Sequence, residues 1–214
     1  MSLKSNLKNI WNFIWHDDSM ASWFVNIILA FILIKFVIYP VLGLLLQTAF
    51  PIVAVVSGSM EHDVTKEYSL TLQGEKIQTG RYRICDKIHQ ESDNLNYNEY
   101  WQNCGDWYEK INISKDQFKD FRFHNGFNTG DIMILHSKKN VKVGDTIVFF
   151  ANRPEPIIHR VVEVNEDMYR TKGDHNDRAD GWVNDEQVIG KALFRIPLLG
   201  YVKIVANEFV NIFR

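Results

Sequence analysis

Residues 21–46 read ASWFVNIILAFILIKFVIYPVLGLLL, a run of 26 residues with a single charge, at Lys35. A helix needs about 20 apolar residues to cross about 30 Å of hydrocarbon, so this run is long enough to span a membrane. A cleaved secretory signal would have a shorter apolar core and a small-residue cleavage site. We therefore expect an uncleaved transmembrane anchor, which Pro40 should kink but not end, because apolar residues continue to Leu46.

The segment before the anchor, residues 1–20, predicts a short interfacial helix. Leu3, Leu7 and Ile10 recur at helical spacing, as expected for one apolar face. Lys4 and Lys8 lie on this side of the anchor, whereas residues 47–60 contain no Lys or Arg. The positive-inside rule then predicts a single-pass protein with a cytoplasmic N-terminus and the rest of the chain on the extracytoplasmic side.

Beyond the anchor, short β-branched and apolar segments dominate. They occur at residues 50–56, 131–135, 145–150, 157–164 and 168–171, separated by Gly, Pro, Asn and Asp turns. No alternation of strands with helices is visible, which argues against a parallel sheet. We expect a mainly β, antiparallel, barrel-like domain built from residues 47–63 and 127–196. Residues 197–214 carry apolar and polar stripes at helical spacing and predict a C-terminal amphipathic helix.

Residues 64–126 interrupt this pattern and predict an inserted subdomain that is polar and rich in aromatic residues. Ser114 and Gln117 have the spacing of a capping box, so a short helix is expected at about 115–122. The aromatic residues could form a membrane-surface patch or, the favoured interpretation, a local core. Cys85 and Cys104 form a disulfide if the compartment is oxidising; two free thiols are the alternative.

Three segments carry residues suited to nucleophilic catalysis. Ser59 lies in Ser57-Gly58-Ser59-Met60, about a dozen residues after the anchor. A serine hydroxyl needs a base to take its proton, and histidine suits that role because its unperturbed pKa is about 6.5. His159 lies in a predicted strand, where its neighbour Arg160 must point to the opposite face. A carboxylate is then needed to orient the imidazole.

That carboxylate could come from the segment TKGDHNDRAD at residues 171–180, which holds Asp174 and Asp180. Its histidine, His175, is expected to be solvated. Taken alone, each of these segments also fits an ordinary turn or strand. Ser59, His159 and one of the two aspartates nevertheless form a possible nucleophile, base and orienting acid on a membrane-anchored chain.

These segments resemble the signature boxes of type I signal peptidases, in the histidine-containing form typical of archaea and the endoplasmic reticulum. Gly130-Asp131 matches a further short box of that family. The resemblance implies a serine endopeptidase that cleaves signal peptides from exported preproteins after small residues. It assigns Ser59 as nucleophile, His159 as general base and Asp180 as the triad carboxylate. Asp174 would support the active-site loop.

The same resemblance assigns to the Ser57 hydroxyl the role of a hydrogen-bond donor to the oxyanion. The family separates its serine box from the next box by a few residues, whereas about 70 residues intervene here; that insert leaves substrate selection open. The resemblance implies no cofactor. Its expected partners are preproteins, the lipid bilayer and, as a further candidate, the secretion translocon. The expected location is the cell membrane, or the endoplasmic reticulum membrane in a eukaryote.

Other classes of function have weaker support in the sequence. The net charge is −2 and no basic stripe with interleaved aromatic residues occurs, so no nucleic-acid partner is expected. His159, His175, Asp174 and Asp180 are acceptable metal ligands, but they lack the spacing of known metal motifs, so no metal site is expected. The alternative that remains is a non-catalytic, membrane-tethered β domain that binds secreted or membrane partners.

Overall fold

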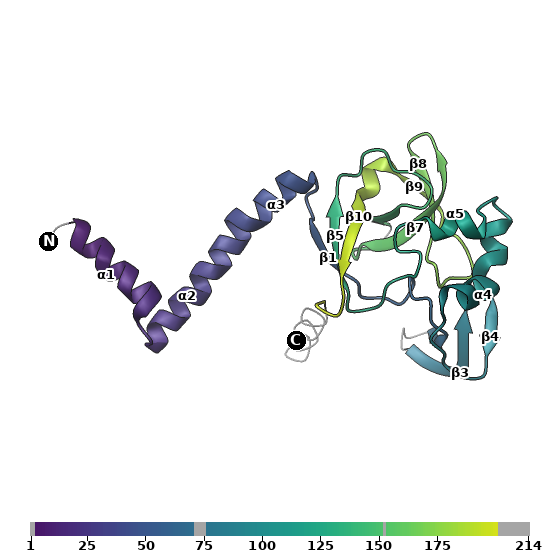
Figure 1. Cartoon of the computed structure of the whole chain (residues 1–214), viewed down its shortest axis with the longest axis horizontal. Coiled ribbons are helices and arrows are strands. Elements are labelled where there is room, and N and C mark those ends of the chain that lie inside the picture. The colour runs from purple at the N-terminus through teal and green to yellow at the C-terminus, as the bar shows by residue number, and fades with distance from the viewer. Residues whose placement is uncertain (1–2, 71–75, 152, 201–214) are drawn as a thin grey trace. The chain divides into compact units, whose positions relative to one another are not determined.

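The structure is a computed structural model, and it describes residues 3–70, 76–151 and 153–200. The chain divides into two compact units, Met1–Ala49 and Phe50–Arg214, which are considered separately. Among the described residues the architecture is mostly β, with ten strands, short helices and one long apolar helix near the N-terminus (Figure 1). The fold class predicted from the sequence is therefore confirmed.

The first unit consists of helices. It contains α1 (Leu3–His16), α2 (Met20–Leu33), a π-helical turn η1 (Ile34–Ile38) and α3 (Tyr39–Leu46). Ser19 caps α2 by accepting a hydrogen bond from the Ser22 backbone N–H, and the Ser22 hydroxyl donates to the Phe13 carbonyl of α1. The segment Met20–Leu46 is long and apolar enough to cross a membrane, judged by its length and composition.

A π-helical turn lies next to Pro40 in this helix. A proline ring removes one backbone donor and clashes with the preceding turn of an α-helix. The π-helical turn η1 lies immediately before α3, and Pro40 occupies the first turn of α3, where its missing donor costs little. The helix therefore continues through Pro40 and ends at Leu46, as predicted.

The second unit is built on a seven-stranded antiparallel sheet. Its strands run in the spatial order β1 (Ile52–Ala54), β5 (Ile132–His136), β10 (Val188–Ile196), β6 (Thr146–Phe149), β7 (Ile157–Asn165), β8 (Met168–Lys172) and β9 (Trp182–Asn184). The 3-10 turn η2 (Asp185–Gln187) joins the last two in sequence, β9 and β10. Alternation along β7 sends Ile158 and Arg160 to one face and His159 and Val161 to the other.

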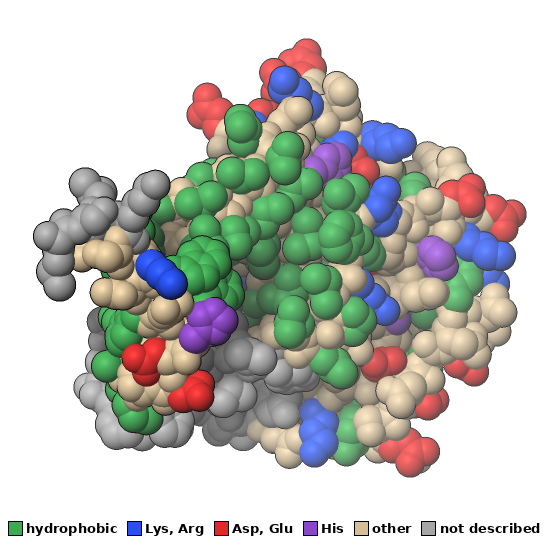
Figure 2. Space-filling model, turned by 60° about the vertical axis from the view of Figure 1, so that its left-hand side comes forward, with side chains coloured by type: hydrophobic (Ala, Val, Ile, Leu, Met, Phe, Trp, Pro, Cys, Tyr) green, Lys and Arg blue, Asp and Glu red, His purple; other side chains and the backbone are tan. Residues whose placement is uncertain are grey.

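Each face of this sheet has its own apolar cluster. Met60, Phe127, Val148 and Ile158 belong to the cluster on one face, and Ile147, Phe149, Val161 and Val183 belong to the cluster on the other. Apolar side chains are also exposed in both units of the chain. Figure 2 shows hydrophobic side chains exposed over much of the face that it views.

The described residues between 64 and 126 form a small three-stranded sheet and two helices. The strands run in the order β2 (Thr65–Leu70), β3 (Lys76–Ile84) and β4 (Lys87–His89), followed by α4 (Tyr97–Glu109) and α5 (Lys115–Lys119). These elements lie together beside the larger sheet (Figure 1). Their apolar cluster contains Tyr100, Trp101, Tyr108 and Phe118, and Val162 of β7 packs into it. The favoured interpretation of the aromatic residues as a local core is confirmed.

Two further predictions can be compared with the structure. Cys85 and Cys104 are joined in a disulfide, with Cα atoms 5.7 Å apart, which decides between the alternatives left open by the sequence. Ser114 and Gln117 form the predicted capping box, although α5 ends at Lys119, three residues earlier than expected. The predicted C-terminal helix at 197–214 falls mainly on residues 201–214, which lie outside the described residues.

Candidate active site

The segment Ser57–Met60 follows β1 and is held by the residue after the serine. Met60 is fully buried in an apolar cluster of the large sheet, and its carbonyl accepts a hydrogen bond from the Phe127 N–H at 3.1 Å. Ser59 is therefore fixed at the surface, where it is half-buried. The Ser57 and Ser59 hydroxyl oxygens lie 3.3 Å apart, so two hydroxyls share this turn.

The loop after β8 approaches the serine closely. The Ser59 carbonyl accepts a hydrogen bond of 3.0 Å from the His175 N–H. A Cβ atom on Gly173 would lie 2.7 Å from that carbonyl oxygen, closer than such contacts occur in proteins. Glycine is needed at position 173 because only a residue without a side chain lets the loop approach the serine turn this closely.

His159 and Asp180 form a tight pair on one face of the sheet. His159 is buried on β7, and its Nδ1 lies 2.5 Å from Asp180 Oδ2. The Thr171 hydroxyl donates to the same carboxylate oxygen at 2.7 Å, and the Asp180 N–H donates to the Thr171 carbonyl at 2.7 Å. Thr171 pairs with Val161 across β7 and β8, which places it on the His159 face.

The electrostatics of this pair determine which imidazole nitrogen is the base. Burial raises the pKa of the Asp180 carboxyl, but the hydrogen bonds from His159 and Thr171 outweigh burial and hold that pKa below its usual range. The carboxylate is therefore ionised at neutral pH and can only accept. Nδ1 of His159 must be the donor, so Nε2 carries the free lone pair.

The structure does not bring the serine and the histidine into hydrogen-bonding contact. Among the described residues, the Ser59 hydroxyl has Ser57 as its hydrogen-bond partner, and none joins it to His159. One loop nevertheless serves both groups, because residues 173–175 contact the Ser59 backbone and Asp180 contacts His159. Catalytic hydrogen bonds are often long in the absence of substrate, so this geometry is compatible with a nucleophile and a base.

Asp174 lies on the other face of the sheet, away from the His159–Asp180 pair. It is fully buried and accepts two hydrogen bonds from Arg160, at 2.6 and 2.9 Å. The Tyr108 hydroxyl donates to it at 3.0 Å, and His62 Nε2 lies 3.0 Å away. Burial raises the pKa of Asp174, but Arg160 and the hydrogen bond with His62 outweigh burial and hold that pKa well below its usual range.

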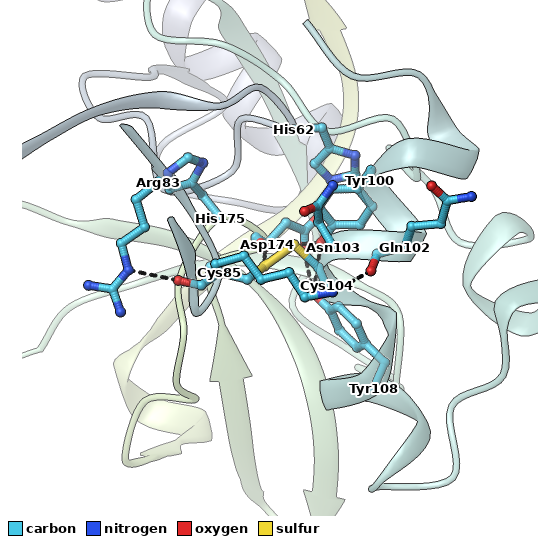
Figure 3. Close-up of a disulfide and its surroundings, with 12 residues drawn as sticks. His62, Arg83, Cys85, Tyr100, Gln102, Asn103, Cys104, Tyr108, Asp174 and His175 are labelled. Atoms are coloured by element: carbon cyan, nitrogen blue, oxygen red, sulfur yellow. Dashed lines mark hydrogen bonds and ion pairs between the residues drawn. A yellow bond between two sulfur atoms is a disulfide. The ribbon is translucent and has the colours of Figure 1, made fainter. Parts of the chain in front are cut away.

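Residues 64–126 hold the backbone of the same loop. The Tyr100 hydroxyl donates to the Asp174 carbonyl at 3.0 Å, and the Cys85 N–H donates to the His175 carbonyl at 2.9 Å. Figure 3 shows the Cys85–Cys104 disulfide lying between these groups, with Asp174 and His175 beside it. The inserted elements therefore support the loop that contacts Ser59.

The sequence did not predict the burial of three titratable groups near this loop. Lys172 is fully buried; its ammonium donates to the Gly173 and Asp174 carbonyls and lies 5.0 Å from the Tyr108 ring centroid. Burial lowers the pKa of Lys172 to about 8. Buried His62 stacks on Tyr100, with ring centroids 3.5 Å apart.

The third group is His175, and here the expectation of a solvated side chain is wrong. His175 is half-buried, with ring nitrogens 3.3 Å from both the Thr65 hydroxyl and the Glu61 carbonyl. These contacts join segments that are more than 100 residues apart in the chain, so no local pattern around position 175 could reveal them. With respect to metals, no group of three or more His, Cys, Asp or Glu side chains within the described ranges could hold an ion.

Comparison with known proteins gives relatives that include catalytic subunits of signal peptidase complexes. The chain is 30% identical over 99 residues to the signal peptidase complex catalytic subunit SEC11C of Homo sapiens, which covers 39% of this chain and 52% of the relative. It is 32% identical over 98 residues to the sec11 subunit of Dictyostelium discoideum, covering 39% and 55%. For SEC11 of Eremothecium gossypii, the identity is 34% over 98 residues, covering 38% and 59%.

The matched region spans about half the length of these curated relatives. No family model matches the chain, and no solved structure matches it. The relatives agree with the resemblance that the serine, histidine and aspartate segments indicated. The curated homologues of this chain are catalytic subunits of the signal peptidase complex.

Proposed function

We propose that this protein is a membrane-bound serine endopeptidase that removes signal peptides from preproteins. The observation that carries the proposal is the contact of 2.5 Å between buried His159 and Asp180, because the loop that holds Asp180 also contacts the Ser59 backbone. A histidine oriented by an ionised carboxylate is the base that a serine nucleophile needs. The curated relatives, which are catalytic subunits of signal peptidase complexes, supply the substrate class.

In this mechanism, the Ser59 hydroxyl attacks the carbonyl carbon of the scissile bond while His159 Nε2 takes its proton. The developing oxyanion receives hydrogen bonds from the Ser57 hydroxyl and the Ser59 N–H. His159 then gives the proton to the departing amine, and the mature protein leaves. A water molecule, deprotonated by the same imidazole, hydrolyses the acyl-enzyme. Asp180 stabilises the imidazolium that forms in each step.

Asp174 has a positioning role in this proposal. Its carboxylate neutralises the buried Arg160, and its backbone lies between Gly173 and His175, which contact Ser59. An unpaired buried charge at either position would be costly, so the pair stabilises the loop between β8 and Asp180. The small residues expected at positions −1 and −3 of the substrate follow from the family resemblance.

The membrane arrangement is also part of the proposal. The candidate span Met20–Leu46 would tether the chain, with the N-terminus in the cytoplasm and the β domain on the opposite side. The Cys85–Cys104 disulfide supports an extracytoplasmic domain, because disulfides persist mainly in oxidising compartments. A preprotein anchored by its own signal segment would meet the enzyme at the bilayer surface, and shared tethering raises the effective concentration. The secretion translocon is a proposed partner at that surface.

The proposal can be tested with purified full-length protein in detergent and a preprotein whose signal ends in Ala-x-Ala. We expect cleavage after the second alanine, identified by sequencing the N-terminus of the product. Ser59→Ala should abolish cleavage, whereas Ser92→Ala, which changes an exposed serine outside the helices and strands, should not. Equal cleavage by Ser59→Ala and the unmodified protein would refute Ser59 as nucleophile. Binding of the preprotein without cleavage by the unmodified protein would favour the non-catalytic alternative.

A further inference from the structure

A polar cleft of about 350 Å³ opens beside Ser59. One wall comes from the β2–β3 hairpin, through Thr65, Glu67 and Arg83, and the facing wall comes from the loop after β8, through residues 175–177. Ser59 itself lines the cleft. A polypeptide bound for attack by Ser59 would therefore have this cleft directly on one side of its scissile bond.

Arg83 joins the two walls of the cleft. Its Nη1 donates to Glu67 on β2 at 3.0 Å, and its Nη2 donates to Asp177 on the loop at 3.2 Å. Its Nε donates to the Cys85 carbonyl at 3.0 Å, as Figure 3 shows. The three charged side chains are 26–36% exposed, so they remain accessible to a ligand. The cleft is therefore a fixed, charged surface.

Glu67 and Asp177 lie at the two ends of the guanidinium, and Lys66 also lines the cleft, so the walls carry charges of both signs. Covering such groups with an apolar side chain would remove water from them without replacing its hydrogen bonds, which is costly. Polar side chains and the backbone of an extended peptide could replace those hydrogen bonds. This chemistry selects a hydrophilic segment and disfavours a large apolar one.

We propose that this cleft binds the first residues of the mature protein, just after the scissile bond, and selects polar over large apolar side chains there. The inference rests on the proposed function. The signal side of the cleavage site leads into the apolar core of the signal peptide. The polar walls of the cleft therefore match the mature side better. The β2–β3 hairpin belongs to residues 64–126, so the insert supplies specificity-determining residues next to the nucleophile.

The test uses preproteins that share one signal sequence and differ in the first three mature residues, which are Ser, Leu, Asp or Lys. An ester of the same signal-side peptide, with a small chromophore as leaving group, lacks the mature segment and measures the attacking machinery alone. We expect kcat/KM to be about tenfold lower for the Leu substrate than for the Ser substrate. For each protein variant, kcat/KM for a preprotein is divided by kcat/KM for the ester. This ratio removes general effects on catalysis.

Arg83→Gln provides a second arm of the test. It leaves Glu67 without its cation and Asp177 with Arg178 alone, 3.6 Å away, so kcat/KM for the Lys substrate relative to the Asp substrate should rise by about two- to tenfold. Arg81→Gln changes an exposed arginine of the same strand that does not line the cleft, and it should leave this ratio unchanged.

The outcomes separate this inference from the proposed function. Hydrolysis of the ester and of all preproteins at rates independent of the mature residues would overturn the inference and leave the proposed function intact. Failure to hydrolyse both the ester and the preproteins would overturn both. If Arg83→Gln does not fold, the comparison of Ser and Leu substrates with the unmodified protein still decides.

Discussion

Replacing Asp180 by asparagine removes one charge from the candidate site with almost no change in shape. The acceptor oxygen of Asp180 receives His159 Nδ1 at 2.5 Å and the Thr171 hydroxyl at 2.7 Å. An asparagine that turns its NH₂ group toward His159 forces the imidazole into the wrong tautomer. One that turns its oxygen toward His159 keeps the tautomer but loses the charge that stabilises the imidazolium. Either arrangement should lower kcat, by about 10²- to 10⁴-fold.

The same substitution should affect stability much less than catalysis. The Asp180 side chain is 28% exposed, so a lost charged hydrogen bond there should cost less than about 2 kcal/mol of unfolding free energy. Preprotein cleavage at saturating substrate measures kcat, and thermal unfolding measures stability. Asp106→Asn, which makes the same change at an exposed position on α4, is the matched control.

Thr171→Val extends the test, because it removes the second hydrogen bond to the same carboxylate oxygen. Alone, Thr171→Val should lower kcat about tenfold. Combined with Asp180→Asn, it should have little further effect. If Asp180→Asn keeps more than about a tenth of the normal kcat, Asp180 does not orient the base and the reasoning fails.

Three further predictions concern the loop and its support. Gly173→Ala should lower kcat/KM by at least about tenfold, because its Cβ would lie 2.7 Å from the Ser59 carbonyl oxygen, whereas Gly181→Ala, with no atom within 4 Å, should have normal kinetics; equal kinetics would refute the close approach. Replacing both Cys85 and Cys104 by serine should lower the unfolding free energy by about 3 kcal/mol in denaturant titrations, and an unchanged midpoint would contradict a stabilising crosslink. Burial lowers the pKa of His62 and of His175, so the unfolded chain binds more protons than the folded protein below about pH 6.5. The contribution of these histidines to the unfolding free energy should be complete above that pH and fall on acidification. An unfolding free energy that stays constant between pH 7 and 5 would contradict burial of neutral histidines.

The features that could be predicted from the sequence depend on local patterns. The apolar run at 21–46 predicted the long helix, because a membrane-spanning helix needs one continuous apolar segment. The β-branched segment around His159 predicted β7, because such residues favour strands. Ser114 and Gln117 gave the start of α5, because a capping box involves residues three apart.

Helix α4 was missed although a signal for it exists. Asn96 and Glu99 form a capping box at its start, and buried Tyr100, Cys104 and Tyr108 recur every fourth residue. Aromatic and polar residues alternate closely in this segment, which concealed the helical period. A search for capping boxes followed by such spacing would have found the helix.

The remaining contacts of the candidate site join segments far apart in the chain. His62 and Asp174 are separated by 112 residues, and Tyr108 and Asp174 by 66. Their partnership depends on how the insert packs against β7 and β8, which no local pattern determines. For the same reason, the sequence left open whether Cys85 and Cys104 pair.

The central claim is that Ser59 and His159 act as one catalytic unit, and a double-mutant cycle tests it most directly. The kcat/KM of preprotein cleavage would be measured for Ser59→Ala, His159→Ala and the double variant, with product N-termini sequenced to exclude other proteases. Residues that act as a unit are strongly non-additive, so the double variant should be no more than about threefold slower than the slower single variant. Losses that multiply in the double variant would contradict the account.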